Sequence, residues 1–127
     1  MVNIDQLLAK PDLLTGGKSY RDVLVAARAR LDDPDRWTQE AYARRVDNET
    51  CKPRDPGACK WCLLGAIAHE SNQFGIIPPP LLTFLEGMRS YCFKDQFQNV
   101  TELNDYLSHS SVLGFLDLAL QQFPEGQ

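Results

Sequence analysis

Residues 61–68 read Trp-Cys-Leu-Leu-Gly-Ala-Ile-Ala, and every one of them is apolar, small or a cysteine. Asp55 is a typical N-cap residue and Pro56 suits the first helical turn, so the pattern predicts a helix over about 56–72. A helix without a polar face must be surrounded by other elements. The remainder of the chain is therefore expected to fold around this helix.

Apolar residues at helical spacing predict further helices over 19–31, about 80–92, about 101–107 and 110–122. The least regular part, 36–55, favours a short helix over 37–43 and then a turn over 46–51 between two short extended pieces. The expected fold class is all-α. We expect an irregular bundle of five to six helices around the central buried helix, with at most one minor β-hairpin.

The chain has 127 residues, which fits a single helical domain over 1–127. Residues 1–17 either lie across the core or form a loosely attached arm. The amino terminus lacks the basic start and apolar stretch of a signal peptide, and no apolar run approaches the length of a membrane span. We therefore expect a cytoplasmic protein with no membrane partner.

Acidic residues outnumber basic ones, and the formal net charge is −4. The imbalance lies in residues 61–127, which hold 2 Lys and Arg against 7 Asp and Glu. Nucleic acid is a poor partner for a chain of this charge. The acidic second half either meets a basic partner or simply confers solubility.

Cys59, Cys62 and His69 share one stripe of the predicted helix, which suggests a metal site or a Cys–His pair. A rise of about 1.5 Å per residue separates Cys62 from His69 by about 10 Å, too far for either. Cys51, Cys59 and Cys62 remain candidate zinc ligands. They lack the two tight ligand pairs of strong zinc signatures, so we expect neither metal nor cofactor.

A thiol site is the second possibility. Cys62 could meet His109 across the fold, with Asn104 or Asp105 orienting the imidazole. One thiol, one histidine and one amide occur by chance in most chains of this length. The alternative is that Cys62 packs in the core and His109 lies in a surface loop.

Polar and aromatic residues of the irregular segment, and the Asn104-Asp105 pair, offer candidates for binding a ligand or partner. They are Trp37, Gln39, Arg44, Arg54 and Asp105. Each also has a structural explanation, since aromatic residues pack in cores and Asn-Asp pairs serve turns and caps.

The chain resembles a family of small, functionally uncharacterised bacterial and phage proteins. The resemblance rests on residues 36–44, 53–56, 61–66, 103–105 and 112–119, and its most specific parts are Trp-Cys-Leu-Leu-Gly-Ala and Asn104-Asp105. It departs from the family pattern at Leu103, where a tryptophan is usual. The resemblance implies a helical fold, points to Trp37, Gln39, Trp61, Cys62, Asn104 and Asp105, and supplies no activity.

These observations favour a non-enzymatic protein that binds another protein, as an inhibitor or accessory module. The alternatives are a thiol-dependent enzyme or small-ligand binder centred on Cys62, and a cysteine-based zinc site.

Overall fold

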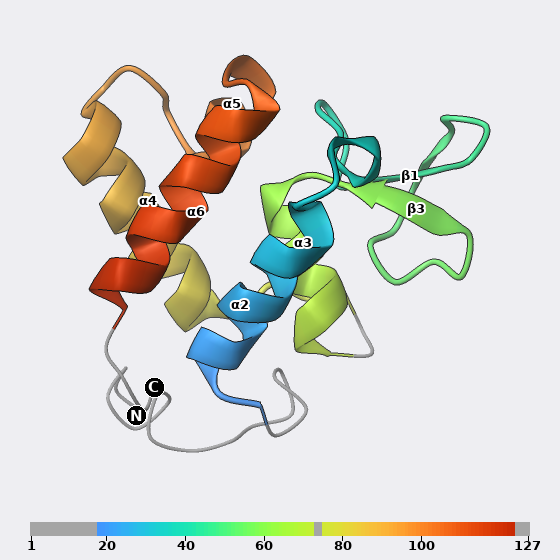
Figure 1. The fold of residues 1–127 in the computed structure, drawn as a ribbon, viewed down its shortest axis with the longest axis horizontal. Coiled ribbons are helices and arrows are strands. Elements are labelled where there is room, and N and C mark those ends of the chain that lie inside the picture. The colour runs from blue at the N-terminus through green and yellow to red at the C-terminus, as the bar shows by residue number, and fades with distance from the viewer. Residues whose placement is uncertain (1–17, 73–74, 124–127) are drawn as a thin grey trace.

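This computed structural model describes residues 18–72 and 75–123. These residues contain five α-helices, one short 3-10 helix and a small three-stranded sheet, joined by loops (Figure 1). The elements in chain order are α2 (Tyr20–Leu31), the short 3-10 helix η1 (Pro34–Arg36), β1 (Ala43–Arg45), β2 (Thr50–Cys51), β3 (Ala58–Trp61), α3 (Leu63–Ser71), α4 (Pro79–Phe93), α5 (Val100–Tyr106) and α6 (His109–Gln122). The predicted arm over 1–17 lies outside the described residues.

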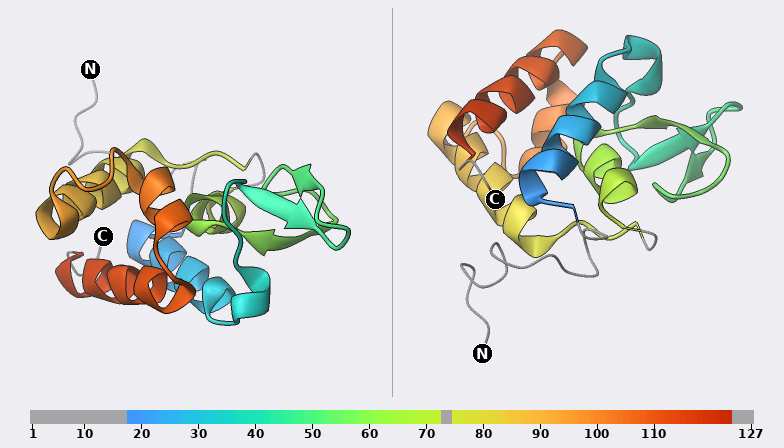
Figure 2. Two further views of the ribbon diagram at one scale, coloured as in Figure 1. Left: turned by 90° about the horizontal axis from the view of Figure 1, so that it is seen from above. Right: turned by 60° about the horizontal axis from the view of Figure 1, so that its bottom comes forward.

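The sheet corrects the predicted fold class, because the protein is mixed α/β with helices dominant rather than all-α. Its strand order is β2-β1-β3, and both pairs are antiparallel. The β1–β2 hairpin contains the turn expected over 46–51, but the third strand was not expected. Two views agree that the sheet projects from one side of the molecule, with α4 and α6 on the other side (Figures 1 and 2).

The predicted helix over 56–72 is wrong in its first third. Residues Ala58–Trp61 form β3 because β1 supplies their hydrogen-bond partners, with Ala43 opposite Trp61 and Arg44 opposite Lys60. Cys62 then caps α3, which begins at Leu63. A short apolar run has no periodicity that separates strand from helix, so only the long-range pairing decides between them.

The predicted helix over 37–43 is also wrong. Glu40 has a φ of 64°, in the left-handed region that interrupts a helix. The Thr38 amide donates to the Trp61 carbonyl at 3.0 Å, which ties the segment to β3 instead of to its own turn. Residues 37–42 therefore run as an irregular connection from η1 into β1.

The other predicted helices are confirmed, with small changes at their ends. Ser19 caps α2, Asn99 rather than Thr101 caps α5, and Ser108 caps α6. All five apolar positions predicted to face inward from α2 are buried, as are all five predicted for the last helix, including Phe123 just after α6.

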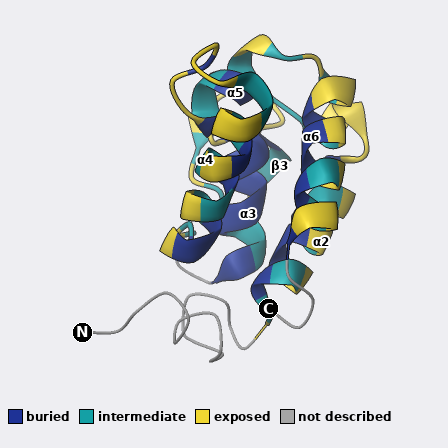
Figure 3. Ribbon diagram, turned by 90° about the vertical axis from the view of Figure 1, so that its left-hand side faces the viewer, coloured by how far each residue is buried: buried dark blue, intermediate teal, exposed yellow. Residues whose placement is uncertain are grey.

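The predicted burial of residues 61–68 is confirmed as well. Figure 3 shows α3 almost entirely buried among the other helices, while α4, α5 and α6 turn exposed faces outward. None of the helices in the described residues has both the length and the apolar character needed to cross a membrane.

Candidate functional site

Asn104, on α5, joins three separate parts of the chain although its side chain is only 1% exposed. Its Oδ1 accepts from the Trp37 indole N–H at 2.8 Å and from the Leu63 amide at 3.0 Å, at the start of α3. Its Nδ2 donates to the Thr38 carbonyl at 3.1 Å and to Asp105 Oδ1 at 3.3 Å. Every donor and acceptor of this amide is thus used inside the fold.

Gln39 extends the same connection toward the end of α5. Its Nε2 lies within hydrogen-bond distance of the carbonyls of Asn104, Asp105 and Leu107, at 3.1, 2.9 and 3.1 Å. The Glu40 amide donates to Asp105 Oδ1 at 2.8 Å. We call Trp37, Gln39, Asn104 and Asp105 the Asn104 junction; the structure brings these four predicted residues together.

The two predicted arginines lie elsewhere. Arg44 holds the connection into β1, donating to Thr38 Oγ1 at 3.0 Å and to the carbonyls of Gln39 and Asn48 at 3.2 and 3.0 Å. Arg54 donates to the His69 carbonyl at 2.8 Å, near the end of α3. Arg44 therefore supports the Asn104 junction through the Gln39 backbone, while Arg54 holds a loop against α3.

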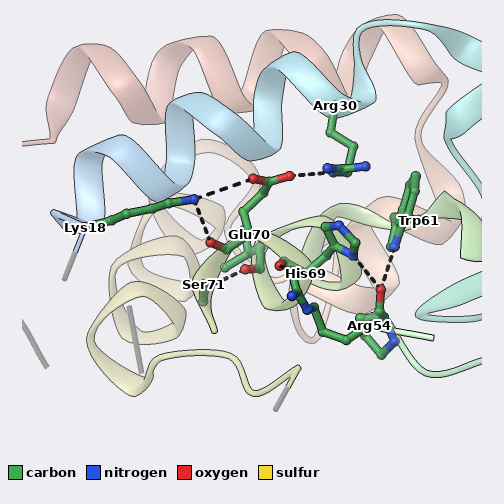
Figure 4. A network of polar contacts seen from close by, with 9 residues as sticks. Lys18, Arg30, Arg54, Trp61, His69, Glu70 and Ser71 are labelled. Carbon is green, nitrogen blue, oxygen red and sulfur yellow. Dashed lines mark hydrogen bonds and ion pairs between the residues drawn. The ribbon is translucent and has the colours of Figure 1, made fainter. Parts of the chain in front are cut away.

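Figure 4 shows the surroundings of Arg54, a second set of polar contacts that fastens the loop before β3 to the helices. The Pro53 carbonyl lies 2.9 Å from the Trp61 indole nitrogen and 2.7 Å from His69 Nδ1. Arg30 stacks over the Trp61 ring at 4.5 Å and pairs with Glu70 at 2.5 Å. Burial lowers the pKa of His69, so this imidazole stays neutral at pH 7 and donates through Nδ1–H.

Cys62 occupies the N-cap position of α3, where its Sγ accepts from the Gly65 amide at 3.2 Å. The residue is 3% exposed, and burial raises the pKa of its thiol to about 11. The helix N-terminus opposes this shift, because amide N–H groups favour a thiolate. Burial outweighs it, and the thiol is protonated at neutral pH.

Among the described residues, His109 forms no hydrogen bond with Cys62. Its Nε2 lies 2.6 Å from the Leu31 carbonyl, and its ring packs on Trp37 with centroids 5.5 Å apart. Asn104 and His109 both contact Trp37, whereas Cys62 lies at the start of α3. None of His109, Asn104 and Asp105 forms a hydrogen bond with the Cys62 thiol.

We expect Cys62 to resist alkylation in the native protein. At pH 8 a thiol of pKa about 11 is ionised in about one molecule in a thousand, and burial blocks the reagent as well. Iodoacetamide labelling followed by peptide mass spectrometry should modify the half-buried Cys59 and Cys92 first, and Cys62 only in denaturant. Labelling of native Cys62 as fast as Cys59 would contradict this.

The candidate zinc ligands Cys51, Cys59 and Cys62 are free thiols. Within residues 18–72 and 75–123, no three His, Cys, Asp or Glu side chains come together in a way that could hold a metal ion. Cys51 belongs to β2, Cys59 to β3 and Cys62 to the start of α3.

An open groove runs along the outer face of α5. Its first hollow, of about 230 Å³, lies between this helix and the connection into β1; its lining is Glu40, Ala41, Tyr42, Cys62, Thr101 and Asp105. The second, of about 390 Å³, shares three of these residues; its lining is Glu40, Asn99, Thr101, Glu102, Asp105 and Tyr106. The third, of about 330 Å³, continues past Glu102; its lining is Gln96, Phe97, Glu102, Tyr106 and Leu107. We call the three adjoining hollows the α5 groove.

The middle hollow of the α5 groove is acidic, and the third hollow is largely apolar. Glu40, Glu102 and Asp105 contribute carboxylates, while no lysine or arginine among the described residues lines any of the three hollows. None of these three carboxylates forms an ion pair with another described residue, although six ion pairs occur elsewhere in that part of the chain. Tyr106 lines both of these hollows and is 74% exposed.

Sequence reasoning named Asp105 and Cys62 as candidates but did not identify the groove that they line. Part of the signal was present in α5, where Thr101 and Asp105 form a pair four residues apart opposite Leu103, and Glu102 and Tyr106 form a second such pair beside it. Glu40 and Tyr42 could not be placed beside them from the sequence, because they come from a segment with no regular structure.

A family model described as "Family of unknown function (DUF6197)" matches residues 16–122 of the chain. No curated protein and no solved structure matches this chain. The matched region contains every element of the sheet and all five described helices. The chain therefore belongs to this family of unknown function.

Proposed function

We propose that this chain is a non-enzymatic module that binds another protein through the α5 groove. The observation that carries the proposal is an open groove flanked by the exposed aromatic side chains Tyr42 and Tyr106. Tyrosine is enriched where proteins bind one another, since it offers a large contact area with few rotatable bonds.

Hydrogen bonds beneath the α5 groove hold its two walls in place, which favours binding. Asn104 and Gln39 hold the backbone of α5 against the connection that carries Glu40, so both walls are fixed before any partner arrives. Less conformational entropy is then lost on binding.

The non-enzymatic part of the proposal rests on how the candidate reactive groups are used. The Cys62 thiol is buried with a raised pKa, the Asn104 amide is fully hydrogen-bonded, and the His109 ring is held between Trp37 and the Leu31 carbonyl. We also place the protein in the cytoplasm, since its four free cysteines are typical of a reducing compartment.

This proposal is tested by replacing Tyr106 with a photo-crosslinking amino acid. The matched control is the same replacement at Tyr91 on α4. Tyr91 is 80% exposed and lies outside the groove. Irradiation in cells that naturally make the protein should give a discrete covalent adduct from position 106 and none from 91. The protein crosslinked at position 106, once identified and purified, should then bind the wild type at least about tenfold more tightly than it binds the Tyr106→Ala variant.

Equal adducts from both positions, or a purified partner that binds Tyr106→Ala as well as the wild type, would count against the α5 groove as the contact surface.

A thiol-dependent activity is the second candidate, because Cys62 lines the first hollow together with Asp105. The labelling experiment above separates the two. Fast alkylation of native Cys62 supports the thiol candidate, and protection until unfolding supports a packing role.

A further inference from the structure

We infer that the α5 groove accepts an extended segment of a partner protein in which a lysine or arginine lies two residues from an apolar side chain. This inference rests on the proposed function and names the chemistry of the partner. Two features carry it: the carboxylates of the middle hollow and the apolar lining of the third.

Carboxylates surround the middle hollow, and none of them pairs with a lysine or arginine in the part of the chain that the structure describes. Glu40 and Asp105 come from its two walls, and Glu102 lies one residue past Thr101 on the same helix. Asp105 Oδ1 is occupied by the Glu40 amide and Asn104 Nδ2, whereas its Oδ2 forms no hydrogen bond with another described residue. An ammonium or guanidinium group here would gain charge-assisted hydrogen bonds that no group of the described chain supplies.

The next hollow offers apolar contact instead of charge. Phe97 and Tyr106 stack there with ring centroids 6.3 Å apart and planes 16° from parallel, and Leu107 completes the lining. Phe97 itself is buried and provides an apolar surface beneath the exposed Tyr106 ring. An apolar side chain of a partner would cover the exposed Tyr106 ring.

The middle and third hollows adjoin, because Glu102 and Tyr106 line both. In an extended segment, side chains two residues apart are separated by about 6.5 Å and point to the same side. A basic and an apolar side chain at alternate positions therefore reach the two hollows together. The same carboxylates repel the phosphates of nucleic acid and of anionic lipid, which favours a basic peptide over either of them.

A random 12-residue peptide library displayed on phage provides the probe, selected against wild-type protein. Peptides that bind the groove are identified as those that bind the wild type but not the Tyr106→Ala variant. We expect them to be enriched in lysine or arginine two positions from an apolar residue. The matched variants are Glu40→Gln with Glu102→Gln, which keep the size of each side chain and one of its two oxygens but remove the charge, and Glu49→Gln, which changes an exposed glutamate in the β1–β2 turn.

The charge-neutral double variant should bind the selected peptides at least about tenfold more weakly than the wild type, while Glu49→Gln should bind them equally well. Raising the salt concentration should weaken wild-type binding, as expected for exposed ion pairs.

Three outcomes overturn the inference, and they differ in what they say about the proposed function. Groove-binding peptides without basic enrichment would overturn the partner chemistry alone. Absence of any peptide that depends on Tyr106 would overturn the groove as a protein-binding surface as well. A dimer in sedimentation experiments that the double variant abolishes would show that a second copy of this chain occupies the groove.

Discussion

Replacing Asn104 with alanine should lower the free energy of unfolding by about 3 kcal/mol or more, the largest loss expected from any single polar substitution here. The change leaves three groups without a hydrogen-bond partner, because all three bond to the buried Asn104 amide in the wild type. They are the Trp37 indole N–H, the Leu63 amide and the Thr38 carbonyl. Each buried group left without a partner costs about 1–3 kcal/mol, reduced where water enters. Urea unfolding followed by circular dichroism measures the difference.

Two further variants make this prediction specific. Asn104→Asp keeps an acceptor for Trp37 and Leu63 but loses the donor to Thr38, and it buries a charge beside Asp105. It should therefore be destabilised as well. Gln121→Ala removes an exposed amide from α6 and should change stability by less than about 0.5 kcal/mol. A near-neutral Asn104→Ala would mean that the Asn104 junction adds little to the fold.

Replacing Gly65 with alanine should lower the free energy of unfolding by a similar amount, for a steric reason. A Cβ atom at this position would lie 1.8 Å from the Tyr42 carbonyl oxygen and 2.8 Å from its carbon. The obstacle is backbone, which cannot change rotamer, so α3 must move away from the connection into β1. That carbonyl also accepts from the Cys62 amide at 3.1 Å, and the shift would break this bond. We expect a loss of about 3 kcal/mol or more in the same unfolding experiment, at the upper end for overpacked cores.

Gly87 and Gly114 are matched controls, since they lie within α4 and α6 and a Cβ at either position meets nothing within 4 Å. Alanine there should stabilise the protein by about 0.5–1 kcal/mol, because it reduces the entropy of the unfolded chain. Equal effects at Gly65 and Gly114 would show that close approach to Tyr42 does not limit position 65.

The helices of this protein could be predicted because their signals are local. In α2, an N-cap serine precedes apolar residues at helical spacing, and each of those apolar residues is buried as expected. In α6, Ser108 and the inward positions from Val112 to Ala119 follow the same logic. Capping and periodicity act over a few residues, so one sequence is enough to identify them.

The sheet and the α5 groove could not be predicted in the same way. β3 is only four residues long, and its partner β1 carries two arginines, so neither has a clear alternation of apolar and polar residues. The groove combines α5 with Glu40, whose positive φ is stabilised by a hydrogen bond from its own amide to Asp105. Both features depend on residues distant in the chain that satisfy one another's backbone groups.

Sequence alone determined that residues 61–68 would be buried, since an unbroken apolar run has no stable exposed position in water. It also determined the buried faces of α2 and α6, whose predicted inward positions are all buried. Tertiary structure decided where strand gives way to helix within that segment, because Trp61 pairs with Ala43 and Cys62 caps α3 only once β1 lies beside them. It also decided that Asn104 supports the fold while its neighbour Asp105 faces the groove, because a buried amide must find all its hydrogen-bond partners within the protein.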